Sequence, residues 1–141
     1  MRYNPNNDLT LSFFPRTSVL VVEDDAALRE VYRSALRTAG YSVVAVEDGA
    51  DALRYIEQRQ PGAVVLDLGL PRVGGRDVNR ELKARPNTSG IPVVVVSGTD
   101  MSDLNPKDFS SMLMKPIQPD TLVWAVDNSI RRARARTADP T

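Results

Sequence analysis

The chain has 141 residues, 42% hydrophobic and 26% charged, a composition typical of one globular domain with a real core. Lysine plus arginine number 18, and aspartate plus glutamate also number 18, so the net charge of zero gives no overall indication of a nucleic-acid or membrane partner. The chain contains no cysteine and no histidine, which excludes disulfides, thiolate zinc sites, serine–histidine catalysis and a phosphohistidine.

The first residues, 1–16, lack hydrophobic periodicity, and we expect them to form a flexible extension. No apolar run approaches the roughly 18 residues that a membrane span needs. The apolar stretch 9–14 is too short for a signal peptide. We therefore expect no membrane contact and a cytoplasmic location, which the absence of cysteine also favours.

Five apolar runs then alternate with amphipathic segments. The runs predict strands at residues 18–22, 41–46, 63–67, 91–96 and 112–114. Helical periodicity predicts helices from Ala26, after the turn Asp48-Gly49, from Gly74-Gly75 and from Pro119-Asp120, with a poorly defined helix at residues 100–108. Strand followed by helix, repeated along the chain, is typical of a parallel sheet with helices on both faces.

The helix expected from Ala26 shows the periodicity well. Five residues are expected on its buried face: Leu28, Val31, Tyr32, Ala35 and Ala39. Gly40 follows as a helix-ending residue, and Asp25 is more simply explained as a helix cap than as a ligand.

Four of the predicted strands end in chemically useful residues. Asp67 ends the third strand, at a place where open α/β sheets form their sites. The others are Glu23 and Asp24 after the first strand, Ser97 after the fourth and Lys115 after the fifth. Because the carboxyl ends of parallel strands meet at one edge of the sheet, we expect these side chains around one crevice.

Three carboxylates in one crevice repel one another. At an effective dielectric constant near 20, two charges about 4 Å apart cost about 4 kcal/mol, so either a cation is bound or one acid is protonated. A site of oxygen ligands without histidine favours Mg²⁺. Lys115 would add a positive charge and Ser97 a hydroxyl, which completes the groups needed to form and hold an aspartyl phosphate on Asp67.

These motifs, in this order, resemble the receiver domain of two-component response regulators over about residues 18–130. The matching residues are Glu23-Asp24, the run Asp67-Leu68-Gly69-Leu70-Pro71 with Gly75 beyond it, Ser97-Gly98 and Lys115-Pro116. The resemblance implies a doubly wound, flavodoxin-like α/β fold with five parallel strands in the order 2-1-3-4-5. The receiver domain would cover residues 17–131, between the extension 1–16 and a basic C-terminal tail, 132–141.

The resemblance also implies roles for these residues. Asp67 would accept a phosphoryl group from a sensor histidine kinase or a phosphotransfer protein. Mg²⁺ would be held by Glu23, Asp24, Asp67 and the Gly69 carbonyl, while Ser97 and Lys115 would contact the phosphoryl oxygens. The Lys115–Pro116 bond would be cis. The chain would act as a switch on a downstream protein target rather than as an enzyme, without direct nucleic-acid contact and with room for a phosphorylation-dependent dimer.

Two features depart from the family pattern. The segment between Ser97 and Lys115 is about one helical turn shorter than in the family, and Asn105-Pro106 interrupts it, so we expect a short, irregular or absent fourth helix. Met112 stands where the family often has a switch aromatic, three residues before the lysine, and it is more simply explained as core packing.

Rival interpretations stay open at this stage. One is a degenerate receiver that works as a constitutive scaffold without phosphorylation. Another is a metal-dependent phosphatase with Asp67 as nucleophile, although Gly69 stands where such enzymes need an acid. The arginine-rich segment 131–136 is either a solvated helix end or a docking strip for an acidic partner or nucleic acid. No output domain follows within these 141 residues, so we expect a stand-alone receiver.

Overall fold

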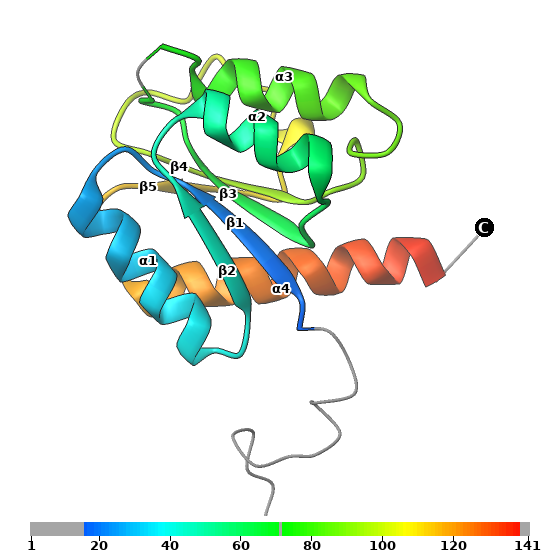
Figure 1. Ribbon diagram of the computed structural model, residues 1–141, viewed down its shortest axis with the longest axis horizontal. Helices are drawn as coiled ribbons and strands as arrows, with labels where there is room; N and C mark the ends of the chain where they lie inside the picture. Colours follow the sequence, from blue (N-terminus) through cyan, green and yellow to red (C-terminus); the bar gives the residue numbers. More distant parts are fainter. Residues whose placement is uncertain (1–15, 71, 139–141) are drawn as a thin grey trace, which may run out of the picture.

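The structure is a computed structural model that describes residues 16–70 and 72–138. Nearly all of the predicted flexible extension, and Pro71 of the Asp67 motif, lie outside these residues. A sheet of five parallel strands in the order β2-β1-β3-β4-β5 forms the centre, which confirms the predicted fold (Figure 1). The strands are β1 (Ser18–Val22), β2 (Ser42–Val46), β3 (Ala63–Asp67), β4 (Val93–Ser97) and β5 (Ser111–Met114).

Four helices cover the sheet in two layers. They are α1 (Ala26–Thr38), α2 (Gly49–Gln58), α3 (Gly75–Ala84) and α4 (Pro119–Ala138). Helices α1 and α4 lie on one face and α2 and α3 on the other, as expected for a doubly wound sheet (Figure 1). None of the helices in the described residues combines the length and hydropathy needed to cross a membrane.

The three inner strands are buried on both faces, which explains their continuous valine runs. In β1, Val19 and Val21 pack under α1 and α4, whereas Leu20 and Val22 pack under α2 and α3. The edge strands β2 and β5 are only partly buried. The core thus fixes the inner strands, whose carboxyl ends carry the candidate site.

The buried face of α1 differs from the prediction. Tyr32 and Leu36 are buried and Leu28 packs against the same cluster, so the stripe advances by four residues at each step. Val31 is 44% exposed, and Ala39 follows the helix and is also exposed. Both lie on the flank of the stripe, where the helix has already turned away from the sheet.

The connection between β4 and β5 contains no α-helix. Its one regular element is a single 3₁₀ turn, Pro106–Asp108, capped by Asn105. Pro106 cannot donate a backbone hydrogen bond, and Asn105 offers its side chain to the Lys107 amide instead, at 3.1 Å. The sequence predicted a short, irregular or absent helix between Ser97 and Lys115, and the structure confirms this prediction.

Helix α4 continues to Ala138, past the predicted boundary at residue 131. Alanine and arginine are both strong helix formers, so the basic segment prolongs the helix. Arg132 donates to the Ser110 carbonyl at 2.6 Å, and Arg134 donates to the Thr17 hydroxyl at 2.9 Å. The arginines of this segment are therefore part of a helix that projects beyond the sheet (Figure 1).

Candidate phosphoacceptor site

Asp67 is the last residue of β3 and is 5% exposed. The Gly69 amide donates to Asp67 Oδ1 at 3.0 Å, which holds the carboxylate toward the sheet edge. The next loop packs closely against the backbone here, because a Cβ on Gly75 would lie only 2.4 Å from the Asp67 carbonyl oxygen. Position 75 therefore requires glycine, and its close approach fixes the backbone of the candidate acceptor.

The acidic pair follows β1 directly. Glu23 is 1% exposed, and its amide donates to the Val46 carbonyl at 3.1 Å, which continues the pairing of β1 with β2. Asp24 is exposed. Asp25 caps α1, as predicted, by accepting from the Leu28 amide at 3.0 Å.

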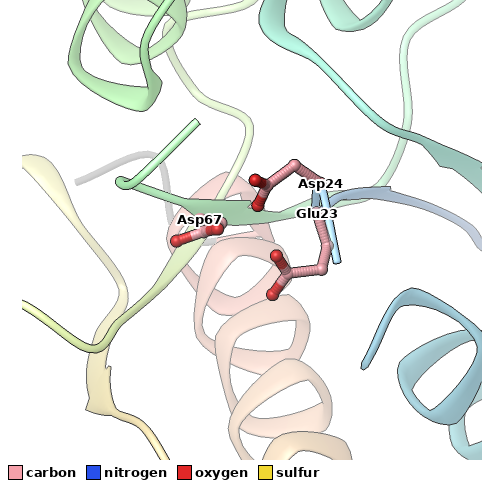
Figure 2. A group of neighbouring side chains, drawn as sticks. All are labelled: Glu23, Asp24 and Asp67. Carbon is pink, nitrogen blue, oxygen red and sulfur yellow. The ribbon is translucent and has the colours of Figure 1, made fainter. Parts of the chain in front are cut away.

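Figure 2 shows the carboxylates of Glu23, Asp24 and Asp67 converging from two neighbouring strand ends. One oxygen from each lies within 4.8 Å of the others. Lys115 lies beside them, with Nζ 2.7 Å from Glu23 Oε1 and 3.4 Å from Asp67 Oδ2. These four side chains, predicted from three strand ends, therefore meet at one place. The Lys115–Pro116 bond is cis, which confirms that prediction.

The two buried acids differ in their affinity for protons. Burial raises the pKa of Glu23 to about 7, even though Lys115 favours its charged form. Burial also acts on Asp67, but hydrogen bonds from Glu23 and the Gly69 amide, together with the charge of Lys115, outweigh it and lower the Asp67 pKa. Burial alone would lower the pKa of Lys115, but Glu23 and Asp67 raise it. Asp67 is therefore held as a carboxylate beside a lysine cation.

Ser97 ends β4 and is fully buried. Its carbonyl accepts from the Lys115 amide at 2.8 Å, which joins the ends of β4 and β5. Its hydroxyl is 2.8 Å from Thr99 Oγ1 and accepts from the Thr99 amide at 3.1 Å. The Ser97 hydroxyl is thus hydrogen-bonded to Thr99, in a turn that the sequence did not predict.

Arg29 contacts the acidic pair, which the sequence analysis missed. Its Nη1 donates to the Glu23 carbonyl at 2.9 Å and to the Asp24 carbonyl at 3.4 Å. In the sequence, Arg29 is one of several arginines spaced along a helix, beside Arg33 and Arg37, and nothing marks it as different. Only the turn of chain between β1 and α1 brings it back to the acidic pair.

The donor set fits a hard divalent cation. Three carboxylates face one another, and the composition excludes histidine and cysteine ligands. One lysine cannot neutralise three carboxylates, so a divalent cation would offset the negative charge that remains. Mg²⁺ bound through few protein ligands, with water and phosphate oxygens completing its octahedron, suits such a site.

Comparison with known families decides the classification. The model of the response regulator receiver domain matches residues 19–127 of this chain. The chain belongs to the response regulator receiver family. The receiver domain predicted from the strand-end motifs is thereby confirmed.

Solved receiver structures share the fold. The signal receiver domain of a putative Luxo repressor protein from Vibrio parahaemolyticus is 30% identical with a TM-score of 0.77, covering 89% of this chain and 98% of that one. A sensor protein from Polaromonas sp. JS666 is 27% identical with a TM-score of 0.78, covering 84% of this chain and 99% of that one.

Curated relatives correct one expectation about partners. The DNA-binding response regulator MtrA of Mycolicibacterium paratuberculosis is 37% identical over 121 residues, 83% of this chain and 52% of the relative. Response regulator MprA of Mycobacterium sp. (strain KMS) is 43% identical over 82 residues, 58% of this chain and 35% of the relative. This receiver chain spans about half the length of the MtrA proteins, which bind DNA, so the expectation of no nucleic-acid contact is contradicted. That expectation rested on the lack of an output domain within these 141 residues, and the match covers only about half of the MtrA relative.

Proposed function

We propose that this receiver domain is switched by phosphorylation of Asp67, with Mg²⁺ held by Glu23, Asp24, Asp67 and the Gly69 carbonyl. The observation that carries the proposal is the convergence of three carboxylates within 4.8 Å, with Lys115 Nζ 3.4 Å from Asp67 Oδ2. A scaffold that used only the fold would not need this arrangement, because like charges at a buried edge cost stability. No feature of the described residues favours the degenerate receiver.

The chemistry requires positioning and charge neutralisation rather than an acid–base residue. A carboxylate oxygen of Asp67, kept ionised by its surroundings, attacks the phosphorus of a phosphohistidine or an acyl phosphate. The bond from phosphorus to the donor breaks, the donor leaves with that electron pair, and an aspartyl phosphate forms. Lys115 neutralises the added charge as an ion-pair partner. The bound Mg²⁺ supplies further charge neutralisation at the phosphoryl oxygens.

The switch itself would begin at Ser97. Its hydroxyl is engaged by Thr99 and would exchange this partner for a phosphoryl oxygen on Asp67. The change would pass into the loop after β4 and alter which proteins bind there. The domain would therefore signal rather than turn over a separate substrate, since Gly69 has no side chain that could protonate a leaving group.

The test is intact mass spectrometry after incubation with Mg²⁺ and acetyl phosphate. We expect one phosphoryl group on the wild type, and none on Asp67→Asn or on wild type treated with EDTA. Asp120→Asn is the matched control, because Asp120 is an exposed acid at the start of α4, and it should be modified like wild type. A folded wild type that gains no phosphoryl group with Mg²⁺ present would overturn the proposal and favour the constitutive scaffold.

A further inference from the structure

The loop between β1 and α1 is held from one side by Arg29. The half-buried guanidinium reaches back from the first turns of α1 and donates to the carbonyls of both Glu23 and Asp24, at 2.9 Å and 3.4 Å. We propose that Arg29 is a positioning residue for the cation site, which fixes these two carbonyls and thereby directs the Asp24 carboxylate toward Glu23 and Asp67. This inference rests on the proposed function.

The two acids differ in how much they need such support. Glu23 is 1% exposed. Its backbone amide donates a hydrogen bond to the Val46 carbonyl at 3.1 Å, and its carboxylate pairs with Lys115 at 2.7 Å. Asp24 is exposed, and within residues 16–70 and 72–138 no lysine or arginine forms a salt bridge with its carboxylate, whereas Lys115 pairs with both Glu23 and Asp67. In the same residues Arg29 is the one side chain that bonds to the Asp24 carbonyl. The orientation of Asp24 therefore depends on Arg29 more than that of Glu23 does.

The hydrogen bonds from Arg29 to the Glu23 and Asp24 carbonyls are not needed to stabilise the start of α1. The start of α1 is already capped by Asp25, which accepts from the Leu28 amide at 3.0 Å, and the Arg29 amide donates to the Asp25 carbonyl at 2.9 Å as part of the helix. The Arg29 side chain turns away from the helix and toward the loop before it. Its two bonds join the helix to the backbone of the acidic pair, which is the part of the chain that must be correctly placed for cation binding.

The positioning role of Arg29 and its positive charge have opposite effects on cation binding. As a positive charge near the site, Arg29 repels Mg²⁺, so its removal alone would tighten binding. As a positioning residue it holds a ligand in place, so its removal would weaken binding. The sign of the change in Mg²⁺ affinity therefore separates the two effects.

The experiment measures the Mg²⁺ dissociation constant by isothermal titration calorimetry for wild type, Arg29→Ala, Arg29→Lys and Arg33→Ala. We expect about 10-fold weaker binding for Arg29→Ala, the size typical of residues that orient metal ligands. Arg33 is the matched control, because it lies one turn further along α1 and pairs with Glu30 at 3.0 Å through Nε. Arg33→Ala removes the same charge and should bind Mg²⁺ within about twofold of wild type.

The lysine variant keeps the charge but loses the planar fork that reaches two carbonyls. It should bind Mg²⁺ less tightly than wild type and more tightly than Arg29→Ala. Circular dichroism in EDTA shows which variants are folded. If Arg29→Ala is unfolded, the test passes to Arg29→Lys. Weaker Mg²⁺ binding by Arg29→Lys then supports the proposal, and wild-type affinity of Arg29→Lys overturns it. Unchanged or tighter binding by folded Arg29→Ala overturns the positioning role alone. Failure of wild type to bind Mg²⁺ overturns both this role and the proposed function.

Discussion

The connection from β3 to β4 and the connection from β4 to β5 each join two neighbouring parallel strands, but they differ greatly in how much of their chain is buried. The one before β4 contains α3, which buries Val78, Asn79 and Leu82. The one after β4 has a single 3₁₀ turn, Pro106–Asp108, which buries none of its residues. Both join neighbouring parallel strands, and both reach the edge of the sheet where the phosphoacceptor site lies.

This difference divides the site into two halves. Asp67 belongs to the well-packed half, where Gly75 lies against its backbone and Gly69 holds its carboxylate. Ser97, Thr99 and Lys115 border the thinly packed half. Elements with few buried apolar contacts open at lower free energy than the core. The chain thus combines a firmly held Asp67, the proposed acceptor, with more easily rearranged groups around Ser97, where the connection from β4 to β5 has no α-helix.

The largest expected effect compares two leucines, one from each connection. Leu82 of α3 is 1% exposed, whereas Leu104, just before the 3₁₀ turn, is only partly buried. We expect Leu82→Ala to lower the free energy of unfolding by about 2–5 kcal/mol, because it leaves a cavity in the core. Leu104→Ala should cost about 1 kcal/mol or less.

Urea denaturation of both variants, followed by circular dichroism, checks this pair. The comparison would fail if Leu104→Ala proved as destabilising as Leu82→Ala, because the segment after β4 would then contribute to the core as much as α3 does. Leu53→Ala offers a control in α2, where a partly buried leucine packs against the same cluster as Leu82.

Most of this architecture could be predicted because it follows from the periodicity of apolar residues and from strand ends. The valine runs fixed β1, β3 and β4, and the topology then brought Asp67, the acidic pair and Lys115 together without any tertiary information. The lack of an α-helix between β4 and β5 was also predictable, because Asn105-Pro106 breaks helices locally. These features depend on residues near one another in sequence, or on rules of sheet topology.

The rest depends on local geometry that periodicity does not encode. Val31 was expected on the buried face of α1 and is 44% exposed, since a face read from spacing alone is wider than the stripe that meets the sheet. The bond between Ser97 and Thr99 and the reach of Arg29 to the acidic pair depend on rotamers and turns. A receiver with no output domain in these 141 residues suggested no nucleic-acid contact, and the DNA-binding relatives contradict that.

The next prediction concerns Glu23 and the pH dependence of protein stability. In EDTA, protein stability should fall between pH 5 and pH 8, because the pKa of Glu23 is about 7 in the folded protein against 4.5 as the ordinary value. The folded state then binds the proton more tightly, so this contribution is complete below pH 4.5 and is lost as the pH rises through 7. The lowered pKa of Asp67 and the raised pKa of Lys115 act outside this window.

We expect a decrease of about 1–3 kcal/mol across this range, measured by urea denaturation at each pH. Glu23→Gln should flatten the profile, and saturating Mg²⁺ should reduce the loss, because a bound cation stabilises the carboxylate. A wild-type profile that is flat or rises between pH 5 and pH 8 in EDTA would show that Glu23 is ionised throughout and that Lys115 compensates its burial fully.

The smallest expected effect concerns the link between the two halves. Arg76 of α3 bonds to both carboxylate oxygens of Asp103, at 3.0 Å and 3.2 Å, and thereby ties the thin segment to the well-packed helix. Both side chains are substantially exposed, so water and salt screen the pair and it should contribute little to global stability. Arg76→Ala should barely change global unfolding, yet it should speed amide hydrogen exchange in residues 100–108 by about 2–5-fold.

Arg80→Ala is the matched control, because Arg80 pairs with Asp77 within α3 and should leave exchange in that segment unchanged. High salt should bring wild type toward the exchange rates of Arg76→Ala, since it screens exposed pairs. If Arg76→Ala exchanges like wild type, packing of the partly buried Phe109 against the core must hold the segment instead. The thin half would then be anchored by an apolar contact next to β5, and its response to phosphorylation would depend on displacing that ring rather than on breaking an ion pair.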